Sequence, residues 1–161
     1  MPQPQWIPSR HLALPGSPDS DDLATGHAAR ALTQESAKER VTGVLIVEDD
    51  FLIGMQTESA LLDAGIGVVG IASTAEEAVL LARQRRPVLA VMDIRLAGQR
   101  DGIEAAGDLF REFGVRCIFA TAHDDQGTRS RAEPFAPLGW LAKPYTMASL
   151  IALVRRSMAA G

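Results

Sequence analysis

The residues best placed to do chemistry follow two apolar runs. Asp93 comes directly after residues 88–92, where a buried strand would reach the surface, and open α/β sheets carry their chemistry at that end of the strands. A single strand-ending Asp more often caps a turn. Glu48 and Asp49 follow a second apolar run, residues 44–47. Consecutive acids repel one another, and a bound divalent cation would offset that repulsion. Hard oxygen ligands favour Mg²⁺.

The acidic segment also has a simpler interpretation. Because the dipole of a helix makes its N-terminus positive, residues 48–50 could be the solvated start of a helix. Asp50 fits that role by itself. Strands one and three are expected to be neighbours in a doubly wound sheet, which would bring Glu48 and Asp49 close to Asp93.

Two more side chains would reach the same edge of the sheet. Thr121 ends one apolar run, and Lys143 follows another. Each is ordinary alone, because Thr is common in strands and Lys is common in loops. The chain has fourteen arginines and two lysines, so a Lys at this place suggests that a compact point charge is needed. With the acids, these groups would complete a site for a phosphoryl group.

The elements that position these residues form an alternating pattern. From Gly43 onward, short apolar runs alternate with helical stripes, which predicts successive βαβ units and a parallel sheet. We expect five strands and five helices in a doubly wound α/β fold. The predicted strands cover residues 44–47, 67–72, 88–92, 115–121 and 140–142. The predicted helices begin near residues 51, 74, 102, 124 and 146.

Local signals predict where two of these helices begin or end. Thr74 followed by Glu77 predicts a capping box, and Pro87 ends the same helix. Residues 124–136 are polar and are broken by Pro134, so the fourth helix should be short and comparatively mobile.

Composition limits the class of protein. The 161 residues include 16 basic and 20 acidic side chains, and a formal charge of −4 argues against a broad nucleic-acid or anionic-membrane surface. We expect one domain over residues 43–158, after an N-terminal extension, residues 1–42, that combines a Pro-rich arm with a weak helical pattern. The only cysteine, Cys117, lies in an apolar run. With no signal peptide or membrane span, a cytoplasmic protein is expected. We expect no output domain after the last helix.

The motifs around the candidate residues resemble the receiver domain of bacterial two-component response regulators, in order and in spacing. The resemblance covers about residues 43–156 and implies the single-domain type, with a (βα)5 flavodoxin-like fold and the strand order 2-1-3-4-5. The matching motifs are residues 44–50, Met92-Asp93-Ile94, Ala120-Thr121-Ala122 and Lys143-Pro144.

The resemblance implies a role for each acid. Asp93 would be the phosphoacceptor, and Glu48 and Asp49 would be the acidic pair that holds Mg²⁺ beside it. The backbone carbonyl of Arg95 would be a further metal ligand.

The resemblance assigns the remaining site residues as well. Thr121 and Lys143 would bind the phosphoryl oxygens. Trp140 occupies the position of a switch aromatic that changes rotamer when the threonine moves, although a plain core Trp is the simpler alternative. The resemblance also favours a cis peptide bond before Pro144.

The chain departs from the family pattern in places. Arg95 and His123 occupy two variable positions that flank the water attacking the acyl phosphate. Both are bulkier than the small or acidic residues sometimes found there, so we expect slow self-dephosphorylation. The loop 94–102 is one residue longer than the common pattern, with Ala97 where Pro is frequent. Residues 119–123 are similar to a Phe-Ala-Thr-Gly-Tyr branch of small receivers from alphaproteobacteria, but differ at its last two positions.

The resemblance implies a phosphorylation-dependent signalling switch that is not an enzyme acting on other molecules. A sensor histidine kinase or a phosphotransfer protein would phosphorylate Asp93. The face formed by the fourth helix, the fifth strand and the last helix would then regulate a downstream protein. No direct DNA binding and no membrane binding are expected, and homodimerisation is left open.

Other functions would use some of the same residues. A phosphorelay intermediate or a phosphate sink would need the same site. A small phosphatase with an aspartyl nucleophile is the alternative of another class, but it would need a second Asp where Arg95 stands. A degenerate receiver that serves as a constitutive interaction module would not need so complete a set of acids.

Overall fold

The computed structural model describes residues 42–160, so the predicted arm and weak helix of residues 1–41 lie outside the described residues. In the described part, five strands alternate with five helices, and a short 3₁₀ turn follows the fourth helix. The strands are β1 (Val44–Val47), β2 (Val68–Ala72), β3 (Leu89–Met92), β4 (Arg116–Thr121) and β5 (Gly139–Ala142). The helices are α2 (Phe51–Asp63), α3 (Ala75–Arg85), α4 (Gly102–Phe113), α5 (Gln126–Ala132) and α6 (Met147–Ala159), and the 3₁₀ turn is η1 (Glu133–Phe135).

The strands form one parallel sheet in the order β2-β1-β3-β4-β5. This order confirms the predicted doubly wound fold. The chain leaves β1 toward β2 at one edge and then crosses back to β3 on the other side of β1. Open α/β sheets bind their ligands at the carboxyl ends of the strands where the strand order reverses. Here the order reverses between β1 and β3, so the residues after these two strands lie at that point.

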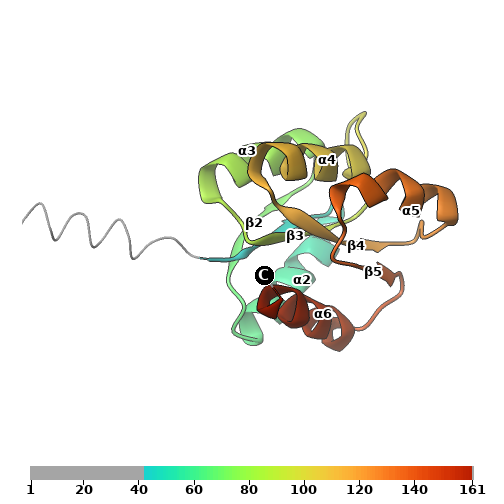
Figure 1. Ribbon diagram of the computed structural model, residues 1–161. Helices are drawn as coiled ribbons and strands as arrows, with labels where there is room; N and C mark the ends of the chain where they lie inside the picture. The colour runs from blue at the N-terminus through green and yellow to red at the C-terminus, as the bar shows by residue number, and fades with distance from the viewer. Residues whose placement is uncertain (1–41, 161) are drawn as a thin grey trace, which may run out of the picture. The chain divides into compact units, whose positions relative to one another are not determined.

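Helices cover both faces of the sheet (Figure 1), with α3, α4 and α5 on one face and α2 and α6 on the other. Strands β1 and β3 are consequently buried along their whole length, as continuous apolar runs predict. Alternate side chains of β4 divide between the two cores: Phe119 packs on the α4 side and Ile118 on the α6 side. Cys117 is buried in the same core as Phe119.

The helix caps differ partly from those predicted. Thr74 caps α3 by accepting the N–H of Glu77 at 3.1 Å, but the Glu77 carboxylate accepts the N–H of Ser73 at 2.8 Å instead of that of Thr74. The predicted reciprocal box is therefore only half formed. A complete capping box opens α4, where Asp101 and Glu104 each accept the other's backbone N–H at 2.9 Å. This pair was not predicted from the sequence, although it fits the same rule.

The fourth helix is short, as predicted. Helix α5 has seven residues and passes directly into η1, which contains Pro134. The predicted mobility of this segment stays a prediction. No helix among residues 42–160 is both long enough and apolar enough to span a bilayer.

Candidate functional site

The candidate site lies at the carboxyl ends of four strands. Beyond the ends of β3 and β5, one more backbone hydrogen bond continues the ladder and fixes the next residue. The Asp93 N–H donates to the Val47 carbonyl at 2.9 Å, and the Lys143 N–H donates to the Thr121 carbonyl at 2.9 Å. The predicted residues of β1, β3, β4 and β5 therefore meet at one edge of the sheet.

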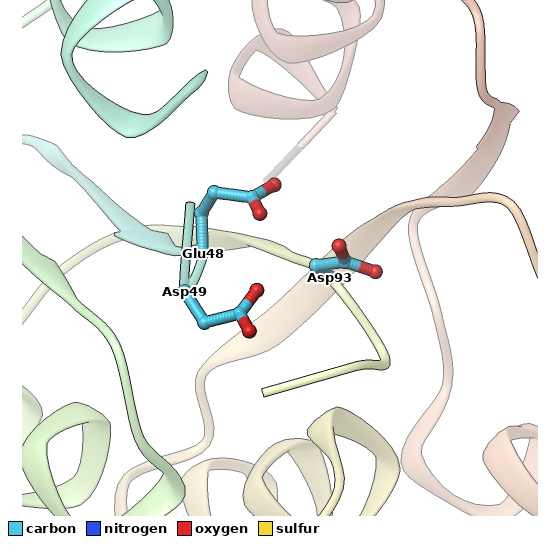
Figure 2. Close-up of side chains that lie close together, drawn as sticks. All are labelled: Glu48, Asp49 and Asp93. Carbon is cyan, nitrogen blue, oxygen red and sulfur yellow. The ribbon is translucent and has the colours of Figure 1, made fainter. Parts of the chain in front are cut away.

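Three carboxylates gather beyond β1 and β3. Figure 2 shows Glu48, Asp49 and Asp93 beside one another, and one oxygen of each lies within 4.8 Å of the others. Glu48 and Asp93 are 7% and 8% exposed, whereas Asp49 is exposed. Carboxylate oxygens at this spacing are the donors that a hard divalent cation prefers, so the residues fit Mg²⁺.

Asp50, the third consecutive acid, serves the following helix. Its Oδ1 accepts the N–H groups of Leu52 at 2.9 Å and Ile53 at 3.1 Å. Asp50 therefore caps α2, while Glu48 and Asp49 lie near Asp93.

Lys143 connects two of the carboxylates. Its Nζ donates to Oδ2 of Asp93 at 2.7 Å and to Oε2 of Glu48 at 2.8 Å. Burial by itself would lower the pKa of the Lys143 ammonium, but the hydrogen bonds and charges of Asp93 and Glu48 outweigh burial and raise that pKa. Lys143 is therefore charged at neutral pH. The Lys143–Pro144 peptide bond is cis.

The environment of Glu48 opposes its negative charge. Burial raises the pKa of the Glu48 carboxyl most strongly, the hydrogen bond from Lys143 lowers it, and the charge of Asp93 raises it again, so that the net direction is upward. Three carboxylates face one ammonium at this site. A cation bound among them would stabilise the ionised form of Glu48.

Thr121 and Trp140 come from the neighbouring strands β4 and β5. Thr121 is fully buried at the end of β4, and its Oγ1 accepts the N–H of His123 at 3.1 Å. Trp140 of β5 pairs in register with Phe119 and stacks on it, with ring centroids 4.6 Å apart and planes 22° apart. Trp140 is partly buried against the core of the α4 side. Its ring therefore packs next to the strand that carries Thr121.

Arg95 and His123 are exposed side chains at the rim. Each follows a buried site residue, Asp93 or Thr121, by two positions. The Arg95 N–H donates to Oδ1 of Asp93 at 3.3 Å, so the loop after β3 folds against the carboxylate.

The contribution of Gly102 was not predicted from the sequence. Its N–H donates to the Ile94 carbonyl at 2.7 Å, and a Cβ at this residue would overlap the carbonyl oxygen of Asp93. Only glycine lets α4 begin so close to the Asp93 backbone. An Asp-Gly pair directly before a helical stripe was the available signal, because Asp101 caps the same helix.

The fold and the clustered acids define an open α/β domain with an acidic site at the carboxyl edge of its sheet. Residues 44–155 match the family described as the response regulator receiver domain. The chain belongs to this family of two-component signalling proteins. The match confirms the predicted family.

Two curated relatives show the extent of the similarity. The chain is 36% identical to the phyllosphere-induced regulator PhyR of Methylorubrum extorquens over 127 residues, which are 78% of this chain and 46% of that protein. It is 34% identical to the transcriptional regulatory protein PdtaR of Mycobacterium tuberculosis over 108 residues, which are 67% of this chain and 52% of that protein. The chain thus spans about half the length of these relatives.

Solved structures agree with the fold. The signal receiver domain of a modulated diguanylate cyclase from Desulfovibrio desulfuricans has a TM-score of 0.68 and 36% identity, covering 73% of this chain and 94% of that one. The receiver domain of PhyR from Erythrobacter litoralis has a TM-score of 0.65 and 30% identity, covering 73% of this chain and 90% of that one.

Proposed function

We propose that this chain is a phosphorylation-dependent switch that accepts a phosphoryl group on Asp93 from a histidine kinase or a phosphotransfer protein. The observation that carries the proposal is the contact of the nearly buried Asp93 carboxylate with the Lys143 ammonium, beside two more carboxylates. Phosphoryl transfer needs positioning and charge neutralisation more than covalent assistance, and these groups supply both.

In the proposed reaction, a carboxylate oxygen of Asp93 attacks the phosphorus of a phosphohistidine. A new O–P bond forms, the P–N bond breaks, and its electron pair stays on the imidazole, which takes up a proton from solvent. Glu48, Asp49 and Asp93, with the backbone carbonyl of Arg95, would hold Mg²⁺, which supplies positive charge to the phosphoryl oxygens. Lys143 already contacts Asp93, and its ammonium would pair with the negative charge of the phosphoryl group. The Thr121 hydroxyl would donate to a phosphoryl oxygen.

The output would be read by a protein partner. When Thr121 turns toward the phosphoryl group, the Trp140 ring changes rotamer and the face formed by α5, β5 and α6 changes with it. A coupling of about 1–3 kcal/mol between phosphorylation and partner binding would change partner affinity by roughly 5- to 150-fold. The partner is a downstream protein effector, and the proposed location is the cytoplasm.

Arg95 and His123 are proposed to lengthen the life of the acyl phosphate. Both side chains stand at the rim beside Asp93 and Thr121. Bulky side chains there would obstruct or misorient the attacking water. A long-lived acyl phosphate suits a switch whose output outlasts the signal.

Purified protein incubated with Mg²⁺ and acetyl phosphate tests the proposal on a phosphate-affinity gel. Wild type should shift, and Asp93→Asn should not. A shift that persists in Asp93→Asn would remove Asp93 from the reaction, and no shift in either protein would refute the switch. Continuous hydrolysis of a simple phosphate ester would instead indicate the phosphatase alternative.

A further inference from the structure

Two groups pack on the ring of Trp140, and they come from different elements. The ring of Phe119, on the neighbouring strand β4, stacks on it with centroids 4.6 Å apart. The guanidinium carbon of Arg129, on α5, lies over the Trp140 ring at 5.0 Å from its centroid. A cation at this distance from an indole is attracted by the negative face of the ring. Trp140 therefore cannot change rotamer without leaving both neighbours.

A carboxylate fixes Arg129 in this position. The Arg129 Nε donates to Oδ1 of Asp124, and its second terminal nitrogen donates to Oδ2 at 2.7 Å. A bidentate pair of this kind sets the plane of the guanidinium as well as its place. Asp124 belongs to the loop between β4 and α5 and follows His123, whose N–H donates to Oγ1 of Thr121. The guanidinium over Trp140 is thus anchored three residues from Thr121.

We propose that Arg129 is a positioning residue that holds Trp140 in the conformation described here and sets how readily the switch responds to phosphorylation. We call Asp124, Arg129 and Trp140 the arginine clamp. The inference rests on the proposed function in one respect, since it takes Trp140 as the residue that changes rotamer. The new element is a restraint on this rotamer change, which a residue of helix α5 supplies.

The clamp has a definite thermodynamic consequence. A contact made in only one of two conformations shifts the equilibrium between them by its own free energy. If the clamp exists only in the unphosphorylated conformation, its loss favours the other conformation. Binding of any phosphoryl mimic at Asp93 should then become tighter, roughly two- to fivefold for an exposed cation–π contact.

Arg131 is a matched control on the same helix. Its side chain is 54% exposed, close to the 50% of Arg129, and it also pairs with one carboxylate. That carboxylate belongs to Asp101, the N-cap of α4. Replacement of either arginine removes one surface charge and one ion pair, but only Arg129 lies over the Trp140 ring.

The first measurement needs no phosphorylation. The chain has two tryptophans, so a Trp6→Phe background makes Trp140 the only indole. Acrylamide quenching of Trp140 fluorescence, without Mg²⁺ or donor, should increase in Arg129→Gln and stay unchanged in Arg131→Gln. Asp124→Asn, which keeps the guanidinium but weakens its anchor, should fall between wild type and Arg129→Gln. Circular dichroism checks whether each variant is folded. Equal quenching in the two arginine variants would overturn the clamp.

The second measurement is a titration with beryllium fluoride and Mg²⁺, followed by the fluorescence of Trp140. The half-saturating concentration should fall roughly two- to fivefold in Arg129→Gln and stay unchanged in Arg131→Gln. Equal values in the two variants, with a normal response of wild type, would overturn the clamp and leave the proposed function intact. If no protein shows a fluorescence response that depends on Asp93, the proposed function fails. The quenching result still decides whether Arg129 positions Trp140.

Discussion

At the scale of single residues, Lys143 offsets part of the negative charge of the site. Its ammonium donates to both Asp93 and Glu48, which are nearly buried carboxylates. Without it, two ionised groups would face each other in a poorly solvated place, and removal of one partner from such a cluster leaves charge uncompensated. Lys143 thus has a structural role in the absence of a phosphoryl group.

Replacement of Lys143 by Gln leaves its carboxylate partners without the ammonium donor and should therefore lower the free energy of unfolding by about 1–3 kcal/mol at pH 7 in EDTA. Because the pKa of Lys143 is raised in the folded protein, its contribution is present below the ordinary lysine value of 10.5 and is lost as the pH rises through the raised value. Urea unfolding of wild type, Lys143→Gln and Lys143→Arg checks this, and Mg²⁺ should restore part of the loss. Equal stability of wild type and Lys143→Gln at pH 7 would contradict it.

The residues at the rim should control the lifetime of the phosphorylated protein. We expect His123→Glu and Arg95→Asn each to shorten the phosphoryl half-life, because a smaller or acidic side chain admits or orients water. The decay of phosphorylated protein after removal of acetyl phosphate measures it. A longer half-life in either variant would refute the proposed role.

At the scale of elements, the start of α4 determines the position of the Asp93 backbone. Gly102 lies against the Asp93 carbonyl, and Asp101 caps the helix while its other oxygen accepts from Arg131 of α5 at 2.6 Å. The loop after β3, helix α4 and helix α5 are therefore connected through two consecutive residues, Asp101 and Gly102. A change at this junction should affect both stability and the site.

Gly102→Ala should be strongly destabilising. The added Cβ overlaps backbone that cannot move without shifting Asp93, and overpacking of this kind typically costs about 1–3 kcal/mol or more. Gly127→Ala, in the short helix α5, is the control, because alanine favours helix over glycine and its Cβ would meet only the Asp125 carboxylate, at 3.2 Å. Thermal unfolding of the two variants compares them directly, and a neutral Gly102→Ala would contradict the close packing.

At this scale, the features that could be predicted from the sequence are those that local sequence patterns determine. Continuous apolar runs identified the strands, and Asp93, Thr121 and Lys143 could be placed at one edge because parallel strands share their carboxyl ends. Contacts that depend on tertiary distances could not be predicted. The Arg129 guanidinium over Trp140 and the hydrogen bond from Lys143 to Glu48, 95 residues apart, leave no periodic signal.

At the scale of the whole molecule, the sheet separates two cores, and Cys117 lies in one of them. Burial raises the pKa of its thiol to about 12. The thiolate, which is the reactive form, is therefore almost absent from the folded protein near neutral pH. The thiol can then serve as a reporter of global unfolding.

Cys117 should resist a thiol reagent at pH 8 in native buffer and react at once in denaturant. Its labelling rate across intermediate urea concentrations should follow the fraction unfolded, because only opening of the core gives access. Comparison of labelling with circular dichroism over the same titration checks this. Fast labelling of the folded protein would show that this core opens locally.

The central claim is that Asp93 receives one phosphoryl group in a reaction that needs a divalent cation. Intact-mass spectrometry after incubation with acetyl phosphate tests it most directly, with wild type and Asp93→Asn, each in Mg²⁺ or EDTA. The proposed function predicts a single added phosphoryl group in wild type with Mg²⁺ and none in the other three samples. Phosphorylation of Asp93→Asn, or no phosphorylation of wild type with Mg²⁺, would contradict it.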